Sequence, residues 1–430
     1  MTNKTHFLDE PYGAYYHREV LKEDEELTRV GPGTPCGEYM RRFWHPVAVS
    51  DDLKGLPKAI RILGEDLVVF RDGSGAVGLL ELHCAHRAAS LEFGLIEERG
   101  IRCCYHGWVF DVDGKILKMP GVEGNLKDRL YQGAYPVVEK YGLVFAYMGP
   151  PNKKPEFPDS ANFHLPGYQP AIPTVNVWPC NWPQAKDNNM DPAHAAILHD
   201  HEAQNGVGGY SGFSPAFADF GVMDWADTPF GMVYIVTRRV NDNVWVRLGE
   251  SVLPTNMHVP SGKEDGKEVH EPDFVSGAGW LVPIDDEHTL RIDLVLIPDT
   301  VERFQPEIYG QDGNRPYELR QRIPSDYDAQ VSQRPIAIHA MERLVSTDKG
   351  VIMLRNLIRE GIRAVQRGED PPGIVREPYT IVPTYGSNTV IHIPPAPTEE
   401  EDERLLRETG QRVATQIIEG GGSHRLIPDR

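Results

Sequence analysis

The sequence is short of cysteine, of basic residues and of long hydrophobic stretches. Five cysteines among 430 residues are a sparse, odd-numbered set, which argues against a disulfide framework and favours metal or redox use. With 44 basic residues against 63 acidic ones the net charge is −19, which argues against nucleic acid and against an anionic membrane surface. No apolar run approaches the roughly 18 residues that span a bilayer, and the opening residues lack the apolar segment of a secretion signal. We therefore expect a cytoplasmic protein that binds neither membranes nor nucleic acid.

Hydrophobic residues make up 40% of the chain, enough for a sizeable core, and their patterns divide it into three parts. Residues 1–36 form an N-terminal helical segment. Residues 37–150 carry short strand patterns and are all-β in character. A stretch rich in proline and lysine at 150–160 predicts a linker, and residues 151–430 mix strand patterns with helices. The sequence therefore predicts an α+β protein in which an all-β domain precedes an antiparallel sheet wrapped on a long helix.

Several helices and loops can be placed on the sequence. Helix formers at 18–30 predict an N-terminal helix, and apolar residues at helical spacing predict a long helix at 348–368. The acidic stretch 398–418 predicts a solvated helix. Two loops, at 205–221 and 260–273, are longer than average connections, which favours lids or subunit contacts over passive turns.

Cysteine and histidine recur together at two places in the all-β part. Cys84 and His86 form one pair, and after 16 intervening residues Cys103 and His106 form the second. Structural zinc sites usually group two cysteines on one knuckle and two histidines on a helix, whereas here each loop offers one thiolate and one imidazole. In a Rieske [2Fe-2S] centre one iron takes both thiolates and the other takes both imidazoles. The spacing favours such a cluster over a zinc ribbon or unmetallated thiols.

The strings CAHR at 84–87 and CCYHGW at 103–108 resemble the cluster-binding motif of the Rieske non-haem iron aromatic oxygenases. The motif is normally C-x-H and C-x-x-H, with the second loop ending in Y-H-G-W. Cys104 stands where the family often carries proline, and we expect a packed thiol there rather than a ligand. Cys36 and Cys180 are expected to be buried small hydrophobes.

A second metal site is predicted in the middle of the chain, where His194 and His199 have four residues between them. On an ideal α-helix these side chains would point about 140° apart, so sharing a metal requires local over-widening, as in a π-bulge, or a kink. Two neutral histidines and a carboxylate with open positions form the facial triad of non-haem Fe(II) oxygenases. A zinc hydrolase could use the same set, but the neighbouring cluster would then have no role.

The string DNNMDPAHAAILH at 187–199 resembles the iron motif of the same family, D-x-x-H-x-x-x-x-H. The resemblance makes His194 and His199 the imidazole ligands. It makes Asp191 the acidic residue that bridges an iron ligand to a cluster-ligand histidine of the neighbouring subunit, although Asp before Pro is also a strong helix cap. Asp187 falls where many relatives have Asn, so no role near the iron is assigned to it.

The third ligand is expected far along the chain, because no local carboxylate completes the set. The stretch 325–348 resembles the branch that holds phthalate dioxygenase and the vanillate and lignin-biphenyl O-demethylases, and aligning it places the ligand at Asp326, with Asp328 as the alternative. The competing interpretation is that Ser325 and Asp326 cap the following helix. His339 departs from the branch pattern and is expected to support a ligand or the fold.

The resemblance implies that 37–150 is a Rieske [2Fe-2S] domain and that 151–430 is a helix-grip catalytic domain with a mononuclear Fe(II). It implies a homotrimer or stacked hexamer in which the cluster of one subunit serves the iron of the next. The chain would be the terminal oxygenase component, which uses O₂ and receives electrons from NAD(P)H through a reductase or a ferredoxin. Asp191 would connect the two centres, since a carboxylate on a histidine ring nitrogen fixes the tautomer and raises the basicity.

Branch similarity implies an aromatic acid as substrate, with or without a methoxyl group. A carboxylate in a dry pocket needs a cation, preferably the bidentate fork of arginine. The candidates on predicted strands are Arg247, Arg291 and the pair Arg238-Arg239, and three residues could line the pocket, namely Phe213, Phe217 and Met257. The predicted reaction is O-demethylation or monohydroxylation, and cis-dihydroxylation of a ring is the alternative.

Two hypotheses of other classes compete with an oxygenase. A Rieske electron carrier needs the cluster alone, so its redox function would not require His199. A zinc-stabilised binding module would contain zinc and no inorganic sulfide. Iron and sulfide contents separate the three hypotheses, because an oxygenase of this kind holds about three irons per chain and a carrier about two.

Overall fold

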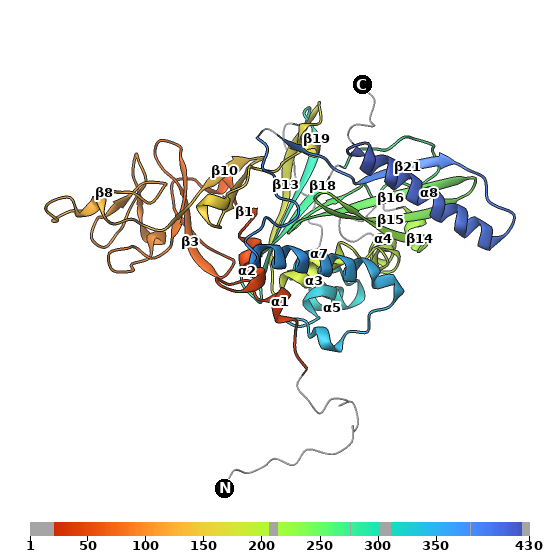
Figure 1. The fold of residues 1–430 in the computed structure, drawn as a ribbon, viewed down its shortest axis with the longest axis horizontal. Helices are drawn as coiled ribbons and strands as arrows, with labels where there is room; N and C mark the ends of the chain where they lie inside the picture. Colours follow the sequence, from red (N-terminus) through yellow and green to blue (C-terminus); the bar gives the residue numbers. More distant parts are fainter. Residues whose placement is uncertain (1–20, 206–213, 276, 302–310, 379, 424–430) are drawn as a thin grey trace, which may run out of the picture.

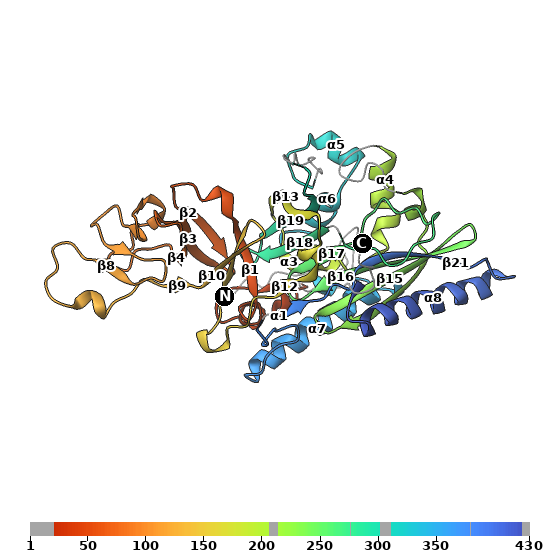
Figure 2. The same ribbon diagram turned by 90° about the horizontal axis from the view of Figure 1, so that it is seen from above.

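We analysed a computed structural model, which describes residues 21–205, 214–275, 277–301, 311–378 and 380–423. Figures 1 and 2 show an elongated molecule with a small β-rich domain at one end and a larger domain of sheet and helices at the other. The predicted α+β class is confirmed by this arrangement.

The first domain is built from three small antiparallel sheets. Short strands and frequent turns suit a domain whose function lies in its loops, because a rigid sheet fixes the ends of each loop. The strands are, in spatial order, β1 (Trp44–Val49), β11 (Leu143–Tyr147) and β10 (Val137–Lys140); β2 (Lys58–Ile62), β3 (Glu65–Arg71), β4 (Val77–Glu81) and β9 (Ala134–Tyr135); and β5 (Leu95–Ile96), β6 (Ile101–Arg102), β7 (Val109–Phe110) and β8 (Ile116–Lys118).

The N-terminal helix is much shorter than predicted. Among the described residues it is limited to α1 (Glu25–Thr28), and a second short helix, α2 (Pro35–Met40), follows. The helix begins directly after Asp24, which is its N-cap: the Asp24 side chain accepts a hydrogen bond from the Glu26 amide. The backbone turns extended at Arg29, so the prediction of one helix over 18–30 was wrong.

An eight-stranded antiparallel sheet forms the second domain. Its strands alternate in direction because hairpins join most neighbours, and the long central strands are buried nearly throughout. The order is β13 (Tyr168–Trp178), β19 (Thr289–Pro298), β18 (Gly277–Pro283), β17 (Asn256–Val259), β16 (Asn243–Val252), β15 (Gly231–Val240) and β14 (Val222–Thr228), with β21 (Ser387–His392) also paired to β16. A separate parallel pair joins β12 (Asp159–Ser160) and β20 (Ile381–Val382).

Helices cover both faces of this sheet. Met232, Tyr234 and Val236 of β15 share a hydrophobic cluster with α7. The alternate residues Val233 and Ile235 share one with α8. Because successive strand residues point to opposite faces, α7 and α8 lie on opposite faces of the sheet. Figure 2 shows α4, α5 and α6 grouped together on one side of the domain. The predicted long helix at 348–368 is confirmed as α7, which packs on α2, β14 and β15. The bounds are α3 (Trp182–Asn188), α4 (Leu198–Gln204), α5 (Tyr317–Arg322), α6 (Asp326–Val331), α7 (Lys349–Gln366) and α8 (Glu399–Glu419).

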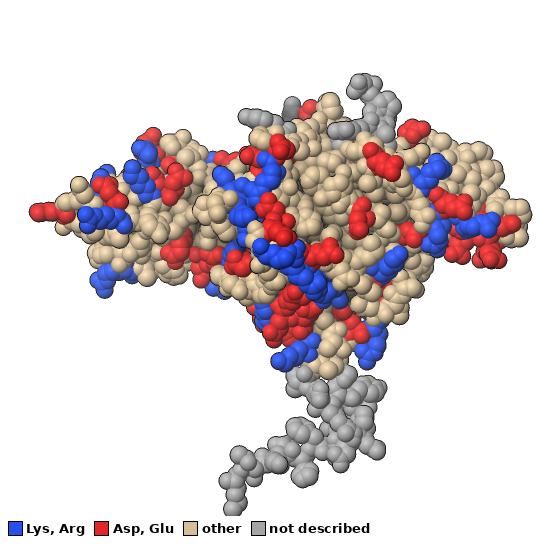
Figure 3. Space-filling view, viewed as in Figure 1, with Lys and Arg blue, Asp and Glu red and all other residues tan. Residues whose placement is uncertain are grey.

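Helix α8 differs from the predicted solvated helix. Its apolar face buries Leu406, Val413 and Ile417 against β14, β15 and β16. The acidic residues gather instead in the first turn, where the positive end of the helix dipole favours them. Figure 3 shows this acidic end of α8 at the right of the molecule. Along α7, by contrast, basic side chains lie beside acidic ones, and Arg359 forms an ion pair with Glu26. The amphipathic pattern therefore reflects packing on the sheet, not full solvation.

Candidate metal centres

The two cysteine–histidine pairs lie on two similar tight turns. In the first, the Ala88 amide donates to the carbonyl of Cys84, and in the second the Gly107 amide donates to the carbonyl of Cys103. Gly107 has φ +71°, which a residue with a side chain adopts only at a cost. The turns follow β4 and β6, so the strands of two sheets hold them in place.

The cysteine side chains of the two turns lie together, and so do the histidine side chains. Cys84 and Cys103 are buried at 3% and 2% exposure, and their thiols interact with each other. Burial raises the pKa of the Cys84 thiol to about 11, and the Cys103 thiol acts in the same direction. The His86 and His106 rings lie with centroids 4.6 Å apart at the outer side of the turns. Two buried sulfurs beside two outward imidazoles suit a cluster with one iron on each pair.

Cys104 does not pack as predicted. It is exposed, because the turn that buries Cys103 points the next side chain to solvent. Cys36 and Cys180 are buried, as predicted. Trp108 stacks on the His86 ring, with centroids 4.6 Å apart and an angle of 5° between the planes, so the last residue of the YHGW string supports an imidazole of the first turn.

The chain between His194 and His199 is broken and does not form a π-bulge. Helix α3 ends at Asn188, a single 3₁₀ turn covers His194–Ala196, and α4 begins at Leu198. The kink is at Ile197, with φ −111° and ψ −58°. The prediction of over-widening or a kink in this stretch is confirmed in its second form, since a break between the 3₁₀ turn and α4 brings the imidazoles together.

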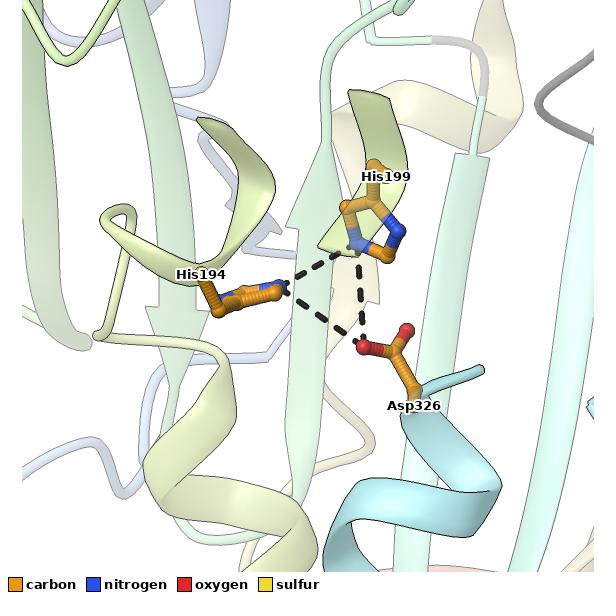
Figure 4. Close-up of side chains that lie close together, drawn as sticks. All are labelled: His194, His199 and Asp326. Atoms are coloured by element: carbon orange, nitrogen blue, oxygen red, sulfur yellow. Dashed lines mark hydrogen bonds and ion pairs between the residues drawn. The ribbon is translucent and has the colours of Figure 1, made fainter. Parts of the chain in front are cut away.

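His194 and His199 converge with Asp326 in one triangle, shown in Figure 4. The two Nε2 atoms are 3.2 Å apart, and each lies 3.7 Å from Oδ1 of Asp326. Two ligands about 2.1 Å from an ion and at right angles to each other would lie about 3.0 Å apart. The spacing of the two imidazoles is close to this value and the two spacings to Asp326 are wider, so the three atoms surround a position within bonding reach of one ion.

The hydrogen bond at Nδ1 of each imidazole determines the protonation of the Nε2 atom that faces the centre of this triangle. The Nδ1 atom of His194 contacts the carbonyl of Asp191, and Nδ1 of His199 lies 2.8 Å from the carboxylate of Glu202. Because each Nδ1 carries the proton that its acceptor requires, both Nε2 atoms present lone pairs. Two lone pairs and the oxygen of Asp326 thus meet at one point, which is the electrostatic complement of a cation.

Burial and neighbouring charge act differently on the two histidines. Burial lowers the pKa of His194, against the opposing effect of Asp326. Burial also disfavours the charged form of His199, but the carboxylates of Asp326 and Glu202 together raise its pKa.

Two neighbouring aspartates of α6 have separate tasks. Asp328 forms a capping box with Ser325 and pairs with Arg315 and Arg320, at 2.5 and 2.6 Å. Asp326, two residues earlier, faces the histidines, and Gln311 donates to its second oxygen at 3.3 Å. The predicted helix cap is therefore real but belongs to Ser325 and Asp328, which leaves the Asp326 carboxylate to the site.

Three other predicted residues lie at the margin of the site. The Asp191 side chain is 28% exposed, accepts from the Ala193 amide and lies 3.8 Å from His194 Nδ1. Asp187 points away and pairs with Arg355 of α7 at 2.6 Å. His339 accepts from the Asp24 amide and supports the fold.

The sequence interpretation missed Glu202 and Gln311. Glu202 had a local signal, since a residue three positions after His199 on a helix shares its face. Gln311 had none, because its contact with Asp326 depends on the tertiary fold.

A cavity of about 320 Å³ opens beside the triangle, which is large enough for a small organic substrate. Phe217 and Met257 line it, as predicted, whereas Phe213 is outside the described residues. Apolar residues form most of the wall, together with three arginines, Arg238, Arg247 and Arg291.

The arginine candidates differ in their partners. Arg291 is paired with Asp293 at 2.9 Å, and Arg239 leaves the cavity to pair with Asp402 of α8. Arg238 and Arg247 have no carboxylate within ion-pair distance among the described residues. Carbonyls of the loop 260–273 and Asn388 bind the Arg247 guanidinium. Burial and the nearby Arg247 lower the pKa of Arg238 to about 10.

Comparison with known proteins finds a family match for the first domain and relatives that cover most of the chain. The family description "Rieske [2Fe-2S] domain" matches residues 43–139. The chain is 41% identical to the tert-butanol monooxygenase / tert-amyl alcohol desaturase oxygenase subunit of Aquincola tertiaricarbonis, over 94% of this chain and 90% of that protein. It is 37% identical to the phenoxybenzoate dioxygenase subunit alpha of Ectopseudomonas oleovorans, over 84% and 90%.

A third relative and a solved structure extend the comparison. The 5,5'-dehydrodivanillate O-demethylase oxygenase subunit of Sphingobium sp. (strain NBRC 103272 / SYK-6) is 30% identical over 94% of this chain and 91% of its own length. The structure of Pseudomonas putida CBB5 NdmA QL mutant with caffeine has a TM-score of 0.60 at 19% identity, covering 80% of this chain and 99% of that one, and shows the shared fold.

The chain belongs to the Rieske non-haem iron oxygenases, as a terminal oxygenase subunit of the phthalate dioxygenase and O-demethylase type. It is an oxidoreductase, and proteins of this class carry a [2Fe-2S] cluster and a mononuclear iron. As part of a multicomponent system it needs an electron donor. Within the described residues we find no helix with the length and apolar character needed to cross a bilayer.

Proposed function

We propose that this subunit oxidises a carboxylated aromatic substrate, by O-demethylation or monohydroxylation, at an iron held by His194, His199 and Asp326. The observation that carries the proposal is the convergence of two imidazole lone pairs and one carboxylate oxygen beside the cavity. Cys84, His86, Cys103 and His106 would hold the [2Fe-2S] cluster. When bound, the cluster supplies single electrons and the ferrous ion activates O₂.

The residues of the chain perform three tasks in this proposal. Asp191 and Glu202 hold the imidazoles with their Nε2 lone pairs toward the ion. Gln311 donates a hydrogen bond to Oδ2 of Asp326, and Oδ1 of the same carboxylate faces the histidines. The apolar wall of the cavity keeps water from the reacting group, so the substrate is oxidised in a dry environment.

Arg238 and Arg247 support the assignment of an anionic substrate. Both line the cavity, and their guanidinium groups lie 5.1 and 5.0 Å from the centroid of the Phe217 ring. Arg238 is 2% exposed, and its Nη1 makes no hydrogen bond with the described residues. A buried cation without a counter-ion is costly, and a substrate carboxylate would offset that cost with charge-assisted hydrogen bonds.

The relatives are named for different kinds of substrate, and the arginines of the cavity favour the anionic kind. Phenoxybenzoate carries a carboxylate, whereas the tertiary alcohols named for the Aquincola relative are neutral. A neutral alcohol would leave the guanidinium of Arg238 unpaired, so we favour the aromatic acid. The dehydrodivanillate relative supports O-demethylation, and the phenoxybenzoate relative supports ring dioxygenation as the alternative outcome.

The fold supports electron transfer between subunits. Figures 1 and 2 place the β5–β8 sheet, next to the cluster turns, at the end of the molecule away from α4 and α6. Tyr105 beside His106 is 58% exposed, and Ile197 between the iron-site histidines is 64% exposed. A homotrimer or stacked hexamer would cover both surfaces and would let Asp191 reach a cluster histidine of the next subunit. A cytoplasmic NAD(P)H-dependent reductase or a ferredoxin would donate the electrons.

Substrate-coupled oxidation with an Arg238→Gln variant tests the substrate assignment. Methoxylated and carboxylated aromatics and tert-butanol are each assayed for NADH use and product with a donor system. Loss of one charge-assisted pair should raise KM for the carboxylated substrate about 10- to 100-fold. Arg239→Gln, which removes the same charge outside the cavity, is the control. Efficient oxidation of tert-butanol, with no turnover of any aromatic acid, would contradict the proposal.

A test of the subunit arrangement uses sedimentation and Asp191→Asn. We expect a trimer or a multiple of it in solution. The variant should keep its iron content and its cluster spectrum but lose electron delivery from the reduced cluster to the iron site. A monomeric enzyme with full activity would contradict the arrangement.

A further inference from the structure

Glu202 occupies a position that none of the metal-site predictions assigned. It lies in α4, three residues after His199, and its side chain is 1% exposed. Its Oε2 is 2.8 Å from His199 Nδ1, while Oε1 has no hydrogen-bond partner among the described residues. Within that part of the chain no lysine or arginine forms an ion pair with Glu202.

The burial of the Glu202 carboxylate requires a compensating interaction. Removing a carboxylate from water is costly unless a positive charge lies close by. The imidazole of His199 separates the carboxylate from the triangle, so a divalent ion at the triangle would supply that charge through the ring. Glu202 and Asp326 would then balance the two positive charges of a ferrous ion.

The two imidazoles are held by unlike partners. His194 Nδ1 faces a backbone carbonyl and a partly exposed carboxylate, both from Asp191. His199 Nδ1 faces a carboxylate that solvent does not reach. Since an anionic acceptor raises the basicity of a metal-bound imidazole more than a carbonyl does, His199 should be the stronger of the two nitrogen donors.

We propose that Glu202 is a positioning residue that sets the tautomer of His199 and raises its affinity for a ferrous ion. This inference rests on the proposed function, because it assumes that the triangle binds iron. Glu202 does not touch substrate, so it acts on the metal through His199 alone.

Ferrous ion affinity of the cluster-loaded protein tests the role. Competition with a chelator gives the dissociation constant anaerobically for the wild type and for two variants. Glu202→Ala should weaken binding about 10- to 100-fold. Glu202→Gln should fall between the two, because its amide oxygen still accepts the Nδ1 proton but carries no charge. Asp200→Asn is the matched control, since it removes a charge from the same helix, and the Asp200 side chain accepts a hydrogen bond from Gln204 and not from a histidine of the triangle.

A second readout separates orientation from general stability. The EPR spectrum of the nitric oxide adduct of the ferrous site should change in Glu202→Gln, whereas the spectrum of the reduced cluster should not. Wild-type affinity in both Glu202 variants would overturn the inference. Failure of the proposed function is distinguishable, because then His199→Ala would also retain wild-type ferrous affinity. If Glu202→Ala does not fold, the nearly isosteric glutamine variant carries the test.

Discussion

His194 Nε2 and His199 Nε2 lie 3.2 Å apart, although a continuous α-helix would point these side chains about 140° from each other. The chain achieves the contact by ending one 3₁₀ turn at Ala196 and starting α4 at Leu198. The site therefore depends on a backbone break as much as on the identity of its ligands.

Asp326 and Asp328 should respond differently to loss of charge. Asp326→Asn should reduce the iron content from about three to about two per chain and leave inorganic sulfide unchanged. Asp328→Asn should keep the iron and lower the free energy of unfolding by about 1 to 3 kcal/mol, because it breaks the capping box and two ion pairs. Iron and sulfide analysis with urea titration measures both. The reverse pattern would make Asp328 the ligand.

His199→Ala distinguishes an oxygenase from an electron carrier. We expect the variant to keep the reduced-cluster EPR signal and to accept electrons from the donor at the wild-type rate. Its substrate oxidation should fall by roughly two orders of magnitude or more, because the iron loses one of two imidazoles. Product formation close to wild type would show that the mononuclear site has no part in the reaction.

Cys103 and Cys104 are adjacent but should not be equivalent. Cys103→Ser should lose the cluster absorption and its EPR signal, since this buried sulfur lies beside Cys84. Cys104→Ser should retain both, because the exposed thiol points away from the turn. Visible absorption of the purified variants is sufficient. Loss of the cluster in the Cys104 variant alone would reverse the ligand assignment.

Lys186 should make stability depend on pH. It is fully buried in α3, donates to the carbonyls of Val252 and Asn256, and burial lowers its pKa to about 7. The unfolded lysine keeps its proton up to about pH 10.4, so between about pH 7 and 10.4 the unfolded chain binds the extra proton and stability rises with pH. Relative to Lys186→Met, the wild type should gain up to about 4 to 5 kcal/mol across this window.

Denaturant titration of both proteins at pH 7, 8 and 9 measures this difference. Other groups titrate equally in the two proteins, so their contributions cancel. A pH-independent difference between wild type and variant would mean that Lys186 is not the group responsible.

Much of the site could be read from local patterns. Cys84 with His86, and Cys103 with His106, sit on turns whose residues are close in sequence, so the spacing already defines their geometry. The same holds for the helix α7, whose apolar period is a local property. The prediction for the N-terminal helix was too long because an N-cap at Asp24 sets where the helix begins. The prediction for α8 was too solvated because its apolar face packs on the sheet, which a local pattern does not reveal.

By itself, the sequence determined the class of protein, and it predicted the four residues of the cluster turns and the pair of histidines. Only the tertiary structure brought Asp326, rather than Asp328, to the histidines, separated Arg238 from Arg239, and placed Gln311 beside Asp326. The reason is physical: neighbours along the chain are fixed by backbone geometry, whereas side chains distant along the chain meet only through the packing of sheet and helices.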